Sequence, residues 1–271
     1  MGKQQISTRP EVGLHMSYKF TPVAITVAGR SVVDAAGEVI KYLEGSTKNR
    51  IYDFDFDAFK HRDNFARSLQ ETRITSATIS AANRLRGRIA LKQTEWFLRQ
   101  EVNAPWADIR QGDSFLNADP SICNGSYDKI CAVWYSFHSI TQIGLKNGVG
   151  DTQINKVLHQ ILPSQVPIFD KKLKKLYFTG NYSGKAKAIC ADVTKKRIKD
   201  NCPSSFADSF IWEPMRQDML KITDQQWLEI RNQILRRDCS SPLIIDKTPV
   251  NIWASVNLSE VRIFDIIGWR L

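Results

Sequence analysis

Apolar residues recur at intervals of three or four positions along most of the chain, and this spacing constrains the fold more than any other feature. In the stretch 126–142, Ile130, Val133, Trp134, Phe137 and Ile140 would all lie on one side of an α-helix. Similar spacing predicts further helices at 32–43, 76–85, 89–101, 151–162, 170–178, 185–200, 223–237 and 259–271. The predicted fold class is therefore all-α.

The length of 271 residues and a hydrophobic content of 42% provide enough apolar material for a sizeable core. Residues 1–15 have the character of a loose N-terminal tail, so we expect one folded domain over 16–271. Apolar runs are only a few residues long, and the start of the chain lacks the apolar core of a signal peptide. We therefore expect a cytoplasmic protein without a membrane span.

The cysteines and histidines show no ligand or disulfide pattern. The cysteines at 123, 131, 190, 202 and 239 form no CxxC pair and no even set, which favours reduced structural thiols. The four histidines are scattered without metal-ligand spacing, so we expect no metal site from them.

The charge balance favours a polyanionic partner. Lys and Arg number 38 against 28 Asp and Glu, a formal net charge of +10. Such an excess allows phosphate neutralisation with release of counterions. A generally soluble basic protein is the alternative, and charge alone does not distinguish DNA, RNA and membrane.

The segment 147–170 combines a glycine turn with a single aspartate: "NGVGDTQINKVLHQILPSQVPIFD". Gly148 and Gly150 allow a tight turn directly before a helix, where unpaired amides at Asp151 and Thr152 can receive an anion. An ordinary helix–helix connection is the alternative interpretation. Asp170, after a proline and two apolar residues, has the position of an N-cap.

The order of these parts resembles the helix–hairpin–helix (HhH-GPD) DNA glycosylase superfamily. The "GVG" turn, the following helix, "VPIFD" and the basic helix "KKLKKLYF" are similar to the adenine-mismatch and thymine-glycol branches, including the offset of the aspartate from the first glycine (170 − 148 = 22). The resemblance covers residues 145–178. It implies a two-lobed helical glycosylase fold with the hairpin at about 126–162 and a hairpin and catalytic segment at 126–178.

The resemblance also implies roles for individual residues. Asp170 would be the catalytic carboxylate, and the hairpin would grip the DNA backbone, with a monovalent cation bound at its carbonyls. Family members that cleave the strand carry a lysine four residues after the first glycine, where this chain has Thr152. Base release without a lysine-dependent lyase step is therefore expected. The implied contacts with the DNA backbone are Lys146, Gly148, Val149, Gly150, Thr152, Lys172, Lys174 and Lys175.

Candidates for the base pocket and for a wedge inserted into DNA are less defined. Aromatic or imidazole side chains that could stack on a flipped base are Trp134, Tyr135, His138, Trp253 and Trp269. Candidates for the wedge come from the segment 74–88 and are Ser76, Ser80, Arg84 and Arg86. Most aromatics at helical spacing belong to a core, and small residues also allow close helix packing.

Two positions depart from the family pattern and indicate a divergent branch. Asn147 replaces the usual proline, and Ile154 stands where a small residue is typical. The cysteines lack the spacing of the family's iron–sulfur loop, so we expect neither that cluster nor another cofactor.

The implied function is a monofunctional glycosylase acting on double-stranded DNA, as a monomer. It would flip a modified or mispaired base and hydrolyse its N-glycosidic bond, in base-excision repair or in defence against phage with hypermodified DNA. A fixed anion near the anomeric carbon would stabilise the oxocarbenium-like transition state. One alternative is a non-catalytic DNA-binding module, and another is a metal-dependent nuclease using Asp53, Asp55 and Asp57.

Overall fold

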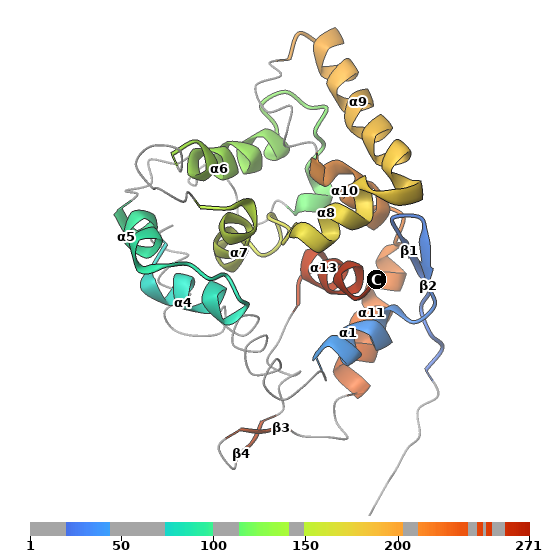
Figure 1. The fold of residues 1–271 in the computed structure, drawn as a ribbon. Coiled ribbons are helices and arrows are strands. Elements are labelled where there is room, and N and C mark those ends of the chain that lie inside the picture. Colours follow the sequence, from blue (N-terminus) through green and yellow to red (C-terminus); the bar gives the residue numbers. More distant parts are fainter. Residues whose placement is uncertain are drawn as a thin grey trace, which may run out of the picture.

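The computed structural model describes residues 20–43, 74–99, 114–140, 149–202, 211–237, 243–245, 248–250 and 258–271. Within these ranges the protein is mostly helical, as predicted, with two short antiparallel hairpins in addition (Figure 1). None of the helices that the structure describes is long and apolar enough to cross a membrane.

The helices and strands follow the chain in this order: β1 (Ile25–Val27), β2 (Arg30–Val32), α1 (Ala35–Leu43), α4 (Ser76–Arg84), α5 (Leu91–Arg99), the 3-10 turn η3 (Phe115–Asn117), α6 (Ser126–Ile140), α7 (Asp151–Ile161), α8 (Lys171–Phe178), the 3-10 turn η4 (Gly180–Tyr182), α9 (Ser183–Lys199), α10 (Glu213–Met219), α11 (Asp224–Arg237), β3 (Leu243–Ile245), β4 (Thr248–Val250) and α13 (Glu260–Arg270).

Two groups of helices pack around one continuous core (Figure 1). In the first group α7 packs on α4 and α6, and α4 also contacts α5. In the second group α1 packs on α11 and α13, and α8 contacts α9 and α13. The segment between α7 and α8 crosses from one group to the other, and this crossing positions the candidate site.

The first predicted helix begins later than expected because its apolar start forms a strand. Val32 lies in β2, where it pairs with Ile25, and Val33 is exposed. The two strands meet at Ala28 and Gly29, which both have positive φ (48° and 75°), a conformation that a tight hairpin turn requires. Ala28 donates its N–H to Asp218 Oδ2 at 2.7 Å, which ties the hairpin to α10.

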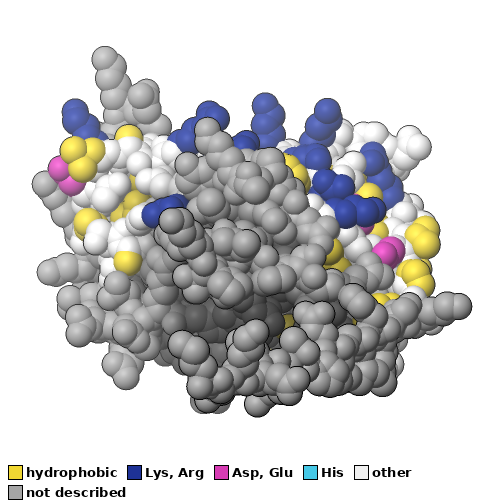
Figure 2. Space-filling model, turned by 90° about the horizontal axis from the view of Figure 1, so that it is seen from below, with side chains coloured by type: hydrophobic (Ala, Val, Ile, Leu, Met, Phe, Trp, Pro, Cys, Tyr) yellow, Lys and Arg dark blue, Asp and Glu magenta, His cyan; other side chains and the backbone are white. Residues whose placement is uncertain are grey.

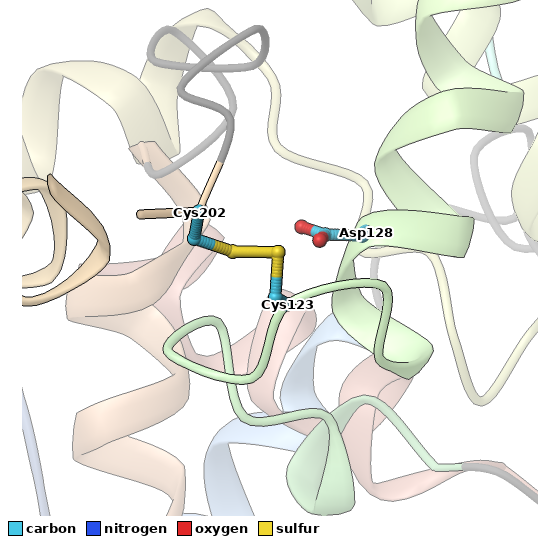
Figure 3. A group of neighbouring side chains, drawn as sticks. All are labelled: Cys123, Asp128 and Cys202. Atoms are coloured by element: carbon cyan, nitrogen blue, oxygen red, sulfur yellow. A yellow bond between two sulfur atoms is a disulfide. The ribbon is translucent and has the colours of Figure 1, made fainter. Parts of the chain in front are cut away.

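A disulfide joins Cys123 and Cys202, so the expectation of reduced thiols throughout is wrong for this pair (Figure 3). Their separation of 79 positions in the sequence leaves no local signal of the pairing. Beside the bridge, the buried Arg197 guanidinium forms an ion pair with Asp128 at 2.9 Å. This corner therefore holds the loop before α6 against the end of α9.

Candidate functional site

The chain between α7 and α8 is held by three buried side chains, each contacting its backbone. Asn155 Nδ2 donates to the carbonyl of Phe169 at 3.3 Å, and the N–H of Ile168 donates to Asp265 Oδ2 at 2.8 Å. Nδ1 of His159 contacts the carbonyl of Val166 at 2.7 Å. Because α7 and α13 both supply these contacts, the end of the segment is fixed relative to both groups of helices.

Asp170 ends this segment and caps α8, as the sequence predicts. Its Oδ1 accepts hydrogen bonds from the N–H groups of Lys172 (2.9 Å) and Leu173 (3.1 Å). The positive end of the α8 dipole therefore faces the carboxylate, an arrangement that favours a negative charge. The side chain is half-buried and lines a pocket.

The pocket has a volume of about 440 Å³ and draws its walls from both helix groups. One wall comes from α7 and the end of α4, and the other from α1, α8 and α13. The lining residues are Lys41, Tyr42, Arg84, Leu85, Arg86, Lys156, Ile168, Asp170, Leu173, Arg262, Asp265, Ile266, Trp269 and Arg270.

Positive side chains dominate this pocket. Lys41, Arg84, Arg86, Lys156, Arg262 and Arg270 line it, against the two carboxylates Asp170 and Asp265. On the face seen in Figure 2, Lys and Arg side chains likewise gather in several groups along the upper border, with few Asp and Glu among the coloured residues. Such a surface attracts a polyanion and raises its local concentration.

Arg84 reaches the pocket from the last position of α4, and Arg86 reaches it from the turn that follows, residues 85–88, here called the arginine turn. The neighbouring helix α7 holds this turn in place. Arg86 and Arg88 have positive φ (57° and 52°), a conformation that non-glycine residues rarely adopt. Gln153 Nε2 donates to the carbonyls of Gly87 and Arg88, both at 3.0 Å. Its Oε1 accepts the N–H of Gly150 at 2.9 Å, so one side chain links the arginine turn to the start of α7.

Only part of the predicted hairpin lies in the described residues. Val149 is buried, Gly150 is the N-cap of α7, and Thr152 is half-buried in the first turn of that helix. Lys146 and Gly148 lie outside the described residues.

The three lysines predicted on α8 are exposed, but they do not line the Asp170 pocket. Lys172 and Lys175 line a second cleft of about 730 Å³, together with Arg30 of the hairpin. The Lys172 ammonium also lies 4.7 Å from the ring centroid of Trp269, a cation–π contact. Lys174 lines neither cleft.

The aromatic candidates separate into core and pocket residues. Trp134 is buried in the core, where Nε1 donates to Asn155 Oδ1 at 2.6 Å, and half-buried Tyr135 packs against it. Neither of the two lines the pocket, whereas Trp269 does. The side chain of His138, and Trp253 as a whole, lie outside the described residues.

Among the wedge candidates, Arg84 and Arg86 line the pocket, while Ser76 and Ser80 are exposed and do not. Sequence reasoning missed Tyr42, Lys156, Arg262 and Asp265. Tyr42 lies on α1, and Arg262 and Asp265 lie on α13. Both helices are far from Asp170 in sequence, so no local pattern indicated these three residues. By its spacing Lys156 lies on the polar side of its helix, so no local pattern indicated that it is buried either.

The described residues contain one group with metal-ligand chemistry, formed by Cys123, Asp128 and Cys202 (Figure 3). Both sulfur atoms are committed to the disulfide and Asp128 to Arg197, so this group offers no thiolate to a metal. Asp53, Asp55 and Asp57, the carboxylates of the alternative nuclease site, lie outside the described residues.

No protein-family model, curated protein or solved structure matches the chain. The chemistry of the site itself is a carboxylate fixed at a helix start, in a pocket shared by two helix groups and rich in Lys and Arg. This arrangement suits an anionic substrate on which positive charge develops during reaction.

Proposed function

We propose that the chain is a DNA glycosylase that hydrolyses the N-glycosidic bond of a modified or mispaired base and leaves an abasic site. The observation that carries the proposal is the placement of Asp170. Its carboxylate is held by two backbone N–H groups inside a pocket that six Lys and Arg side chains also line.

Asp170 would supply the negative charge that this reaction needs. Breaking the base–sugar bond leaves oxocarbenium character on the sugar, which a fixed anion next to the anomeric carbon stabilises. The two backbone hydrogen bonds that hold Asp170 both use Oδ1, so Oδ2 remains to face the sugar and to orient water. The supporting contacts from Asn155 and Asp265 keep the carboxylate from shifting when DNA binds.

The cations of the pocket would bind the phosphates next to a flipped nucleotide. A base must leave the helix before a side chain can reach its sugar, at a cost of about a few kcal/mol. Contacts with the backbone and stacking in the pocket offset this cost. Trp269 and Tyr42 line the same pocket as Asp170 and provide aromatic surface for stacking.

The pocket volume supports a base-sized ligand. At about 440 Å³ it falls within the range of small-molecule sites, roughly 300–1,000 Å³. Substrates to compare are therefore mispaired bases, small oxidative or alkylation lesions, and the larger hypermodified bases of phage DNA.

The test is base release from duplexes that carry such a panel of bases, together with intact phage DNA. We expect free base, strand breaks only after alkali treatment of the purified DNA product, and no effect of a chelator. The Asp170→Asn variant should lose base release on every substrate. Release from no substrate would refute the proposal, and immediate cleavage abolished by a chelator would instead indicate the nuclease.

A further inference from the structure

The second cleft is lined by three cations from separate parts of the chain. Arg30 comes from the start of β2, and Lys172 and Lys175 come from α8. All three residues are exposed, and none of the described residues that line this cleft is an Asp or Glu. The cleft therefore attracts anions. A single phosphate group would fill only a small part of its volume of about 730 Å³, whereas a chain of phosphates would follow its length.

Arg30 is held at the second cleft by a backbone carbonyl. Its Nη1 donates to the carbonyl of Leu271 at 3.2 Å, and this contact uses one of the five N–H donors of the guanidinium. α9 also begins beside the cleft, where its N-cap Tyr182 supplies no side-chain hydrogen bond to the first turn. The ammonium of Lys185 lies 5.4 Å from the ring centroid of Tyr182. The helix dipole and this fourth cation add to the positive potential.

The second cleft adjoins the Asp170 pocket, because the same two helices line both. At α8, Asp170 lines the pocket, while Lys172 and Lys175 line the second cleft. On α13, Trp269 lines the pocket and Gly268 lines the second cleft. The Lys172 ammonium lies 4.7 Å from the ring centroid of Trp269, so the two spaces meet at this lysine–tryptophan pair.

The separation of the two spaces corresponds to a short length of DNA strand. They lie on two sides of the contact between α8 and α13, roughly 10 Å apart, which is the diameter of one helix. A DNA strand advances about 3.4 Å per nucleotide along the helix axis, so about three nucleotides span this distance. Trp269 is 41% exposed, so a strand can pass over its ring.

We infer that the DNA strand whose flipped nucleotide occupies the Asp170 pocket continues over the Lys172–Trp269 pair into the second cleft. There Arg30 and Lys175 bind its phosphates about three nucleotides from the flipped one. The inference rests on the proposed function, because the flipped nucleotide fixes the point from which the strand runs.

This strand path goes beyond the contacts that the family resemblance implies. The resemblance treats Lys172, Lys174 and Lys175 as one set without a position along the strand. The second cleft excludes Lys174, adds Arg30 from the N-terminal hairpin, and sets a distance from the flipped nucleotide. It therefore predicts how much DNA the protein needs on one side of its target.

The test is binding to duplexes that carry a tetrahydrofuran analogue of an abasic site, which requires no base release. The slope of log affinity against log salt concentration is measured for each protein. On a long duplex the double variant Arg30→Ala/Lys175→Ala should reduce this slope by about 2. Lys195→Ala/Lys199→Ala is the matched control, because both lysines are exposed on α9 and line neither cleft. This control should keep the wild-type slope.

Shortening the duplex stepwise from either end locates the contact. In one of the two series the difference between the double variant and wild type should vanish once fewer than about three nucleotides remain beyond the analogue, because the bound phosphates are then absent. In the other series the difference should persist. Lys175→Ala alone should reduce the slope by about 1, which keeps the test decisive if loss of the contact between Arg30 and Leu271 disturbs the end of α13.

Two results would overturn the strand path. One is a wild-type slope for both variants on every duplex. The other is a reduced slope that does not depend on the length of either flank, which would indicate a separate site for a small phosphorylated molecule. Base release together with either result leaves the glycosylase proposal standing. Binding that depends on one flank, without base release from any substrate, would support the path and refute the glycosylase.

Discussion

Replacing Asn155 with leucine tests whether the segment before Asp170 is held as the structure indicates. Asn155 is 2% exposed, accepts the Nε1–H of Trp134 and donates to the carbonyl of Phe169. Leucine has a similar shape but makes neither hydrogen bond. The indole N–H of Trp134 and the carbonyl of Phe169, two buried polar groups, therefore lose this partner. Each such group costs about 1–3 kcal/mol, so the free energy of unfolding should fall by about 2–6 kcal/mol.

Urea unfolding followed by tryptophan fluorescence measures this loss. Asn181→Leu is the control, because Asn181 is exposed in η4, and it should change the free energy of unfolding by less than about 0.5 kcal/mol. A double-mutant cycle with Trp134→Phe isolates the indole hydrogen bond, with an expected coupling of about 1 kcal/mol. A loss below about 0.5 kcal/mol for Asn155→Leu, or zero coupling, would refute this account of the segment.

Three further predictions concern the disulfide, a half-buried thiol and DNA affinity. Reduction of the Cys123–Cys202 bridge should lower the free energy of unfolding by about 2–4 kcal/mol, and Cys123→Ser should show the lower value with or without reductant. Equal free energies of unfolding for reduced and oxidised protein would contradict this. Burial raises the pKa of the Cys190 thiol from 9.0 to about 11, so its thiolate fraction, and hence its alkylation rate in the folded protein, should rise with a midpoint near pH 11. A midpoint near pH 9 would be evidence against that burial. Arg86→Ala should weaken duplex binding and reduce the slope of log affinity against log salt concentration by about 1, whereas Lys195→Ala should leave the slope unchanged. An unaltered slope for Arg86→Ala would place that side chain away from the phosphates.

Helices could be predicted from the sequence because their signals are local. The predicted helix at 151–162 is observed as Asp151–Ile161, and the one at 170–178 as Lys171–Phe178. Asp170 also caps its helix as predicted, since an N-cap depends on only the next few residues.

Features that depend on distant residues were not predictable in the same way. The residues of β1 and β2 are as apolar as the first turn of a buried helix. The turn between them, at Ala28 and Gly29, lacks the Asn-Gly or Asp-Gly pair that usually indicates a hairpin. The disulfide joins residues 79 positions apart in a chain with an odd number of cysteines. The pocket gains Tyr42 and Arg262 only when α1 and α13 pack beside Asp170.

The most direct test of the central claim is the single-turnover rate of base release by Asp170→Asn on the best substrate of the panel. Asparagine also caps helices, so this change removes the charge and keeps the structural role. Asp34→Asn is the matched control, because Asp34 is half-buried, accepts the N–H of Gly37 at the start of α1 at 2.8 Å, and does not line the pocket. We predict that Asp170→Asn lowers the rate about a hundredfold or more without loss of duplex affinity, while Asp34→Asn keeps the wild-type rate. Base release by Asp170→Asn at the wild-type rate would contradict the assignment of catalysis to this carboxylate.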